Sequence, residues 1–428
     1  MTVVIDPVWG ISTFDTWTTE LLSSPEIQRL KHVRLLNSAP ETLASLGDVR
    51  RYTHTLGVVS LAIRICSSDS FVGSKSDART LIAAAALHDV CTPPFGHTLE
   101  YLFNRLSGWH HEEFVLSVLN GTYRPEGKYA QVFHGHRLSL KELLRKGGVS
   151  EIAVAETIGG GGRFGSLIAG GLDLDNIDNI FRMAHHLALS KDVRAAYELV
   201  DCIDLTTNPI SWTNTVLETV DVWTSLRKRV YEVLAFDVAN LTYQAMLTDV
   251  LEIAIREEIL GIEHWSWTDE MLLSRLEKYP PTADLTQRLL SGPPYQPIFI
   301  GWYQSAGDTG RYMTDEFRVT LANRLEKELS VAVTPFFFYD RGMFEKQLTL
   351  KVSESMGSND TKIKILGKAS SSIIACVFAQ KPSYKLTSAD VVCVREVLNE
   401  IGLDRKLLID KPTKASIYGL PGQAKLFN

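Results

Sequence analysis

A short segment in the first quarter of the chain brings together side chains that can bind a metal ion. His88 and Asp89 are adjacent, and after Pro93-Pro94 they are followed by His97. Imidazole nitrogens and carboxylate oxygens are suitable ligands for divalent transition metals. Because the proline pair prevents a helix from continuing, we expect the chain to turn there and return His97 toward the His88-Asp89 pair.

A second segment upstream, Arg51-Tyr52-Thr53-His54, adds another imidazole and a fixed positive charge. Two imidazoles and one carboxylate around a divalent ion, with a free imidazole and an arginine nearby, form a hydrolytic site for a phosphate ester. Each part also has a structural explanation: His54 alone is typical of a buried core residue, and His88-Asp89 of a helix end. Packing does not require the whole set, so the combination favours a metal-dependent hydrolase.

The hydrophobic spacing predicts a mainly helical chain with strands near its C-terminal end. Residues 15–295 have mostly helical periodicity, and after Pro293-Pro294 the chain becomes rich in β-branched and aromatic residues. We therefore predict a helical domain over residues 1–295 and a small α+β portion over 296–428, which is a candidate for packing and oligomerisation. The expected helices are 25–36, 54–67, 76–89, 139–146, 149–157, 176–190, 193–203, 220–262 with a break near residue 236, and 387–401, and the expected strands are 329–339, 345–354 and 371–380.

The composition is that of an ordinary globular protein, because 45% of the 428 residues are hydrophobic and 22% are charged. The net charge of −6 gives no general attraction for nucleic acid. The five scattered cysteines are typical of reduced thiols rather than of a disulfide framework. The N-terminal residues lack a signal-peptide pattern, and no apolar run approaches the roughly 20 residues that span a bilayer. Together these features predict a cytoplasmic protein without a membrane segment.

Several spaced motifs resemble those of the HD-domain phosphohydrolases, and within them the deoxynucleoside triphosphate triphosphohydrolases. In the family, Q-R-L precedes R-x-x-H-[ST]-x-G-V, the central motif is H-D-x-x-x-x-P-F-[GS]-H, and H-E and D-x-D-x-x-D follow. The matching residues here, in chain order, are Gln28-Arg29-Leu30, Arg51 to Val58, His88 to His97, Glu100, His111-Glu112, Asp173 to Asp178 and His185-His186. The resemblance covers about residues 20 to 260 and implies an HD-type helical core.

The resemblance implies a metal site made of His54, His88, Asp89 and Asp175. Two imidazoles and two carboxylates suit Mn, Mg, Fe or Zn, and the sequence does not choose among these divalent ions. On its own, Asp175 is better explained as the N-cap of a helix. Its neighbours Asp173 and Asp178 compete with it as ligands, and only the register of the family motif selects Asp175.

The resemblance also implies an acid/base apparatus beside the metal. His97 takes the place of the catalytic imidazole, and Glu100, one helical turn later, would orient it and keep it basic. His111 corresponds to a second imidazole near the leaving group.

Three further residues correspond to substrate-binding positions in the family: Arg51, Thr92 and Tyr231. Arg51 would neutralise charge on the attacked phosphoryl group. The hydroxyl of Thr92 could donate to a phosphate oxygen, and Tyr231 would line the nucleotide pocket. Since the family cleaves dNTPs at the α-phosphate, the implied products are a nucleoside and inorganic triphosphate. The family also implies a homo-oligomer (dimer, tetramer or hexamer).

The chain departs from the family where relatives contact the sugar. Asn179 and Met183 stand where relatives place Tyr and Asp, and Leu35 falls near an expected Gln. A pocket that recognises a 3′-hydroxyl by hydrogen bonds needs polar partners, which Met183 cannot supply. Two alternatives therefore stay open: an HD hydrolase for another phosphorylated nucleotide or for its base (a nucleotidase or deaminase), and a nucleotide sensor with low turnover.

Overall fold

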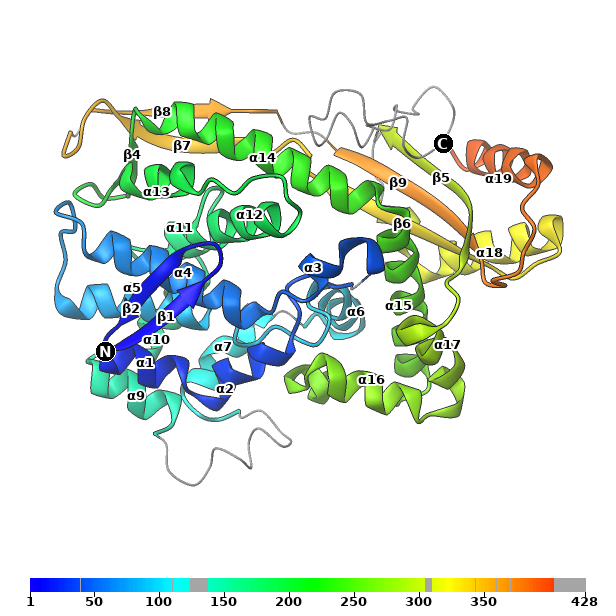
Figure 1. The fold of residues 1–428 in the computed structure, drawn as a ribbon, viewed down its shortest axis with the longest axis horizontal. Helices are drawn as coiled ribbons and strands as arrows, with labels where there is room; N and C mark the ends of the chain where they lie inside the picture. Colours follow the sequence, from blue (N-terminus) through cyan, green and yellow to red (C-terminus); the bar gives the residue numbers. More distant parts are fainter. Residues whose placement is uncertain are drawn as a thin grey trace.

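The computed structural model describes residues 1–428 except 39, 110, 124–137, 305–309, 343, 359, 369–370 and 404–428, and it leaves out the side chains of 106–107, 111–113, 313 and 340–341. The chain is mainly helical, as predicted, with strands concentrated in its C-terminal part. Helices fill the N-terminal side of the molecule, and a three-stranded sheet lies at the other end (Figure 1).

The helical part begins with an antiparallel hairpin that the sequence reading did not anticipate. Strands β1 (Thr2–Asp6) and β2 (Gly10–Phe14) form this hairpin, and it packs on α4. The helices that follow are α1 (Thr16–Leu22), α2 (Pro25–Gln28), α3 (Ala44–Gly47), α4 (Arg51–Cys66), α5 (Lys75–Leu87), α6 (His97–Ser107), α7 (His111–Leu119), α9 (Leu140–Gly147), α10 (Glu151–Ile158), α11 (Gly165–Ile168), α12 (Leu174–His186), α13 (Arg194–Asp201), α14 (Val216–Phe236), α15 (Val238–Arg256), α16 (Asp269–Glu277) and α17 (Pro280–Ser291).

Capping residues set the ends of the helices that carry the candidate site. Ser74 and Asp77 form a capping box that starts α5. Asp173 caps α12 by accepting a hydrogen bond from the backbone N–H of Asn176. The break expected near residue 236 is confirmed, because Asp237 leaves the helical conformation and caps the start of α15.

The helix expected over residues 25–36 is much shorter than predicted. Helix α2 ends at Gln28, one 3₁₀ turn (Arg29–His32) follows, and the chain then becomes extended. There Arg34 forms a β-bridge with Arg50, and the backbone carbonyl of Val33 accepts from the N–H of Arg51 at 2.9 Å. These long-range bonds override the local helical periodicity and hold the start of α4 in place.

The C-terminal part is built on two sheets. Strands β5 (Gln296–Gln304), β9 (Ser371–Ala379) and β6 (Val333–Arg341) form an antiparallel sheet in that order, covered by α18 (Asp315–Leu329) and α19 (Ser388–Glu400) around a second hydrophobic core. The hairpin of β7 (Leu348–Ser353) and β8 (Thr361–Leu366) joins β4 (Ser211–Thr213), which pairs with β3 (Ile203–Asp204). The regions expected as strands 329–339, 345–354 and 371–380 contain β6, β7 and β9, whereas β5, β8 and α18 were not predicted.

Contacts cross the boundary predicted at residue 295. Strand β7 pairs in parallel with β4 of the helical part. On α15, the carboxylate of Asp249 accepts hydrogen bonds from Tyr295 (3.0 Å) and from Thr334 of β6 (2.6 Å). Burial raises the pKa of Asp249 to about 6. The division into 1–295 and 296–428 remains a prediction, and these contacts tie the two segments together.

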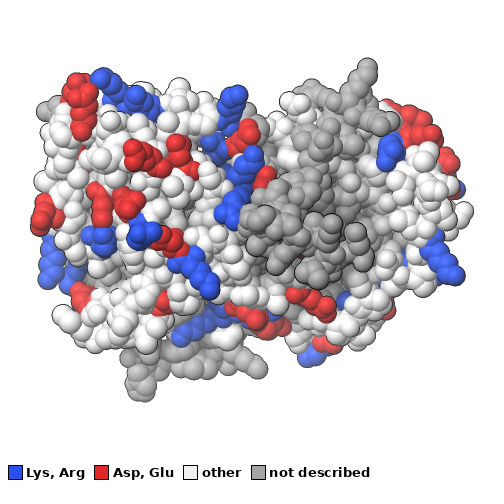
Figure 2. Space-filling model, turned by 45° about the horizontal axis from the view of Figure 1, so that its top comes forward, with Lys and Arg blue, Asp and Glu red and all other residues white. Residues whose placement is uncertain are grey.

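The described surface carries charges of both signs. On the face drawn in Figure 2, basic and acidic side chains of the described residues are interspersed rather than gathered into one basic surface. This distribution agrees with the net charge of −6. None of the helices in the described ranges is long and apolar enough to cross a membrane.

Candidate metal centre

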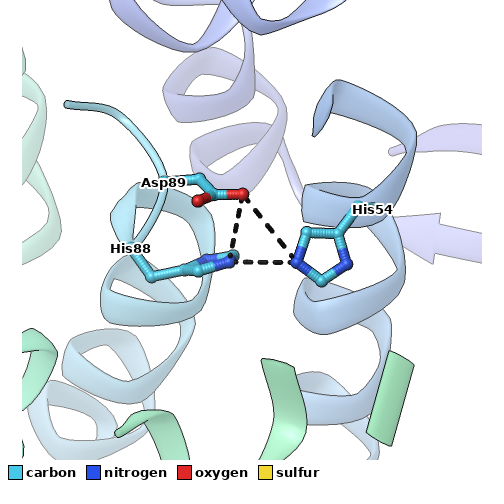
Figure 3. A group of neighbouring side chains, drawn as sticks. All are labelled: His54, His88 and Asp89. Carbon is cyan, nitrogen blue, oxygen red and sulfur yellow. Dashed lines mark hydrogen bonds and ion pairs between the residues drawn. The ribbon is translucent and has the colours of Figure 1, made fainter. Parts of the chain in front are cut away.

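Three helices bring the predicted metal ligands together. His54 lies one turn into α4, His88 and Asp89 follow the last residue of α5, and Asp175 lies in the first turn of α12. The side chains of His54, His88 and Asp89 point toward one another (Figure 3), and each offers a ligand atom within 4.8 Å of the others. The Nε2 atom of His54 lies 3.2 Å from Nε2 of His88 and 2.9 Å from Oδ1 of Asp175.

Hydrogen bonds on the far side of each imidazole orient the two Nε2 atoms. The Nδ1 atom of His54 lies 2.6 Å from a carboxylate oxygen of Asp178, and Nδ1 of His88 lies 2.9 Å from the carbonyl oxygen of Ala85. Both acceptors favour the tautomer with the proton on Nδ1, which leaves a lone pair on Nε2. Two lone pairs that face each other need a cation between them, so this arrangement fits a metal ion.

Asp89 is held with one oxygen satisfied and the other exposed to the imidazoles. Its Oδ1 accepts hydrogen bonds from Arg51 (2.7 Å) and Thr92 (2.8 Å). Its Oδ2 is buried, has no hydrogen-bond partner in the described part of the chain, and lies 3.6 Å from His88 Nε2 and 3.9 Å from His54 Nε2. An ionised buried oxygen without a donor costs free energy unless a cation neutralises it. The donor set therefore fits a divalent ion.

The protonation equilibria of the cluster also favour positive charge at its centre. Burial lowers the pKa of the His54 imidazole, but hydrogen bonds to Asp175 and Asp178 outweigh this effect and raise the pKa to about 10. Burial raises the pKa of Asp89, but Arg51 and the two imidazoles hold it well below its usual range. The carboxylates therefore stay ionised, and they retain a cation among them, which is a proton when no metal is bound.

A buried network behind His54 was not assigned from the sequence. Asp178 is fully buried and accepts hydrogen bonds from His54, from Nε and Nη2 of Arg182 at 2.9 Å, and from the indole of Trp9. Arg182 in turn lies 3.0 Å from Asp6 in the N-terminal hairpin. From the sequence, Asp178 is only a competitor of Asp175 as a metal ligand. The sequence does offer one signal for this role: Asp178 follows Asp175 by three residues, which places both side chains on the same side of α12.

The two residues predicted as an acid/base pair are in contact. Nδ1 of His97 lies 2.9 Å from a carboxylate oxygen of Glu100, and both residues belong to the first turn of α6. The His97 side chain is 71% exposed, whereas that of Glu100 is 14% exposed. Gly96 before them has a φ of +50°, and a Cβ there would lie 2.6 Å from Nη2 of Arg51, so only glycine fits easily between α6 and the arginine.

The residues of the metal centre line a cavity of about 370 Å³. Such a volume falls within the roughly 300–1,000 Å³ typical of small-molecule sites. The lining residues predicted from the sequence are Arg51, His54, His88, Asp89, His97, Asp175 and Tyr231, together with the departing positions Leu35, Asn179 and Met183. Away from the metal centre the wall includes Phe338 and Phe344, which the C-terminal part contributes and the sequence reading missed.

Two predicted residues whose side chains the structure describes, Thr92 and Glu100, are not among those that line the cavity. Thr92 does not line it, because its side chain is buried and its hydroxyl donates to Asp89. Thr92 therefore orients a carboxylate in this structure, and its expected contact with a phosphate stays a prediction. His111 begins α7, but its side chain lies outside the described residues, so its role stays a prediction.

Comparison with known protein families agrees with this geometry. Residues 51–153 match the HD domain. The matched range contains His54, His88, Asp89 and His97. The chain therefore contains an HD domain. Within the described part of the chain, His54, His88 and Asp89 could hold a metal ion.

Curated relatives are similar over part of their length and leave the substrate open. YwfO, an uncharacterized protein of Bacillus subtilis, is 26% identical over 190 residues, which cover 43% of this chain and 40% of that protein. MG461, an uncharacterized protein of Mycoplasma genitalium, is 24% identical over 206 residues, or 46% of this chain and 47% of the relative. MJ1154, an uncharacterized protein of Methanocaldococcus jannaschii, is 24% identical over 201 residues, or 47% and 36%. The chain thus spans less than half of the length of these relatives.

Proposed function

We propose that the protein is a metal-dependent phosphohydrolase that cleaves deoxynucleoside triphosphates at the α-phosphate. The observation that carries this proposal is the convergence of two imidazole nitrogens and two carboxylates, with Arg51 beside them, in the wall of one cavity. His54, His88, Asp89 and Asp175 would hold the ion. When bound, a divalent ion there polarises a phosphoryl group and lowers the pKa of a water molecule.

The remaining residues have separate roles in this reaction. The water oxygen forms a bond to the α-phosphorus, the bond from that phosphorus to the 5′-oxygen breaks, and the 5′-oxygen takes up a proton. His97 is suited to move that proton, because it lines the cavity and its other nitrogen contacts Glu100. The guanidinium of Arg51 would donate to a phosphoryl oxygen while it holds Asp89.

The aromatic residues of the cavity wall support the binding of a nucleoside next to the attacked phosphorus. Tyr231, Phe338 and Phe344 line it, and aromatic faces of this kind pack well against a base. Cleavage at the α-phosphate requires the sugar and base to lie directly beside the metal centre, and the enclosed lining leaves room for them there.

One observation favours a second candidate, a nucleotidase that acts on a different phosphorylated nucleotide. Leu35 and Met183 line the cavity, and neither offers a side-chain hydrogen bond to a sugar hydroxyl. The amide of Asn179 is the nearby polar alternative. A substrate recognised mainly by shape, with a different sugar or a single phosphate, would suit this wall.

The deciding experiment identifies the products. Purified, metal-loaded protein is incubated with a panel of dNTPs, NTPs and nucleoside monophosphates in H₂¹⁸O, and products are identified by mass. Nucleoside together with ¹⁸O-labelled inorganic triphosphate supports the proposal. Stepwise loss of phosphate from a triphosphate, hydrolysis of monophosphates alone, or a deaminated nucleotide would overturn it.

The ligand assignment has a matched pair of variants on α12. Asp175 contacts His54 at 2.9 Å, whereas Asp173 caps the helix and has no contact with His54. Asp175→Asn should lower both metal content and turnover. Asp173→Asn should keep the metal and change the stability little, because Asn caps a helix about as well as Asp. Equal metal content in the two variants would remove Asp175 from the ligand set.

The homo-oligomer stays a prediction that the family resemblance supports. Sedimentation of the purified protein at micromolar concentration tests it. A species with the mass of one chain under those conditions would contradict it.

A further inference from the structure

The charged residues that line the cavity leave little positive charge for a polyphosphate. Among the described lining residues, the carboxylates are Asp89, Asp173 and Asp175, and the only arginine is Arg51. Arg51 already forms an ion pair with Asp89 at 2.7 Å. A metal ion would neutralise the attacked phosphate, but any further phosphates of the substrate need other cations.

Two cations belong to segments that contribute to the cavity wall, one from each part of the chain. Arg227 of α14 lies one turn before Tyr231, and its guanidinium stacks 4.7 Å from the centre of the Tyr231 ring, which lines the cavity. Arg227 also donates a 2.8 Å hydrogen bond to the carbonyl of Gly342. Gly342 adjoins Lys346, because a Cβ on the glycine would lie 3.9 Å from Cα of Lys346.

Lys346 belongs to the C-terminal part and is close in sequence to the cavity wall. It follows Phe344, which lines the cavity, by two residues. Burial and the neighbouring Arg227 lower the pKa of its ammonium group, whereas Asp173 and Asp175 raise it. Within the described part of the chain, Lys346 makes no hydrogen bond or ion pair. Two half-desolvated cations near each other repel, and an anion bound between them would relieve that repulsion.

We propose that Arg227 and Lys346 form an anion subsite that binds the phosphates of the substrate beyond the one attacked, an assignment that rests on the proposed triphosphate hydrolysis. The subsite lies beside Tyr231 and opposite Asp173 and Asp175, where the polyphosphate chain would leave the metal centre. It makes the C-terminal part a component of the substrate site, and it selects nucleoside triphosphates over monophosphates.

The test uses the full-length protein and a probe without a nucleoside. Binding of inorganic tripolyphosphate and of inorganic phosphate is measured by calorimetry, with the metal removed by chelation. Lys346→Gln should weaken tripolyphosphate binding at least about tenfold, as expected from the loss of a charge-assisted contact. Lys346→Arg should restore it, and Lys364→Gln, an exposed lysine of β8, serves as the control. Higher salt should weaken tripolyphosphate binding by the wild type and reduce the difference in affinity between the wild type and Lys346→Gln.

Two results would overturn the subsite. Tripolyphosphate binding by Lys346→Gln equal to that of wild type would do so. So would an unchanged affinity for tripolyphosphate combined with an altered affinity for Mn²⁺, because Lys346 would then serve only to balance Asp173 and Asp175. The outcomes separate the two proposals: dNTP hydrolysis with the same KM in wild type and Lys346→Gln refutes the subsite alone. Tripolyphosphate binding that depends on Lys346, without any dNTP hydrolysis, refutes the proposed function alone.

Discussion

Replacing Asp178 with asparagine tests whether the buried network behind His54 holds the metal centre in place. The two carboxylate oxygens of Asp178 face donors on both sides. Oδ1 accepts from the indole of Trp9 and from Nη2 of Arg182, and Oδ2 accepts from His54 and from Nε of Arg182. Asparagine has one acceptor oxygen, so its amide nitrogen must face one of these two pairs of donors.

The expected cost follows from this count of donors. Two hydrogen bonds lose their acceptor, and Arg182, which is fully buried, keeps only Asp6 as a counter-charge. A hydrogen bond to a charged group contributes about 1.5–3 kcal/mol, and breaking a buried ion pair costs about 3–5 kcal/mol. Asp178→Asn should therefore lower the free energy of unfolding by about 3–5 kcal/mol. Without the carboxylate that fixes the ring of His54, metal affinity should also fall about 10–100-fold.

The assay combines urea unfolding with competition against a chelator of known affinity. Asp173→Asn is the matched control, because it removes a buried carboxylate from the start of the same helix but touches no imidazole. The control should keep nearly its full stability and bind metal normally, because Asn caps a helix about as well as Asp. If Asp178→Asn unfolds within about 1 kcal/mol of wild type and binds metal as tightly, the reasoning about this network is wrong.

Three further predictions follow from individual contacts. His97→Ala should keep the bound metal, measured by elemental analysis, and lose about 10²–10⁴-fold in turnover; loss of metal would make His97 a ligand instead. Gly57→Ala should lower the melting temperature through a loss of about 1–3 kcal/mol or more, because a Cβ there would lie 1.7 Å from Asp178 and 2.5 Å from Trp9; an unchanged melting temperature would refute this. For Asp249 the folded pKa is raised to about 6 from 3.8, so wild-type stability should fall as the pH rises from about 4 to 6, by at most about 3 kcal/mol. Asp249→Asn should flatten that dependence in unfolding experiments, and a parallel pH profile would contradict the assignment.

The parts of the site that could be predicted from the sequence are those set by local order. The turn after Pro93-Pro94 and the helix that carries His54 both follow from residue type and spacing. The break at Asp237 is also local, since an Asp at the start of a helix caps it. Motif spacing then placed His88 and Asp89 beside His54, and the structure brings these three side chains together.

The parts that could not be predicted depend on contacts between distant segments. Trp9 and Asp178 are 169 residues apart in the chain, and no local pattern links them. Phe344 in the cavity wall comes from a segment whose strands were anticipated but whose position against α14 was not. The hydrogen bond from the hydroxyl of Thr92 to Asp89 could not be predicted either, because it depends on how the turn folds. In each case the packing of the folded chain determines which partner a side chain has.

The candidate site thus depends on contacts from the N-terminal hairpin and on lining residues from the C-terminal part. Asp6 and Trp9 of the N-terminal hairpin hold Arg182 and Asp178, which in turn fix the imidazole of His54. The C-terminal part contributes Phe338 and Phe344 to the cavity wall, and Lys346 follows two residues after Phe344. A metal centre of four acceptor groups is electrostatically unfavourable before a cation binds. A rigid shell of buried ion pairs is therefore needed to keep the acceptors together, and the hairpin supplies that shell behind His54.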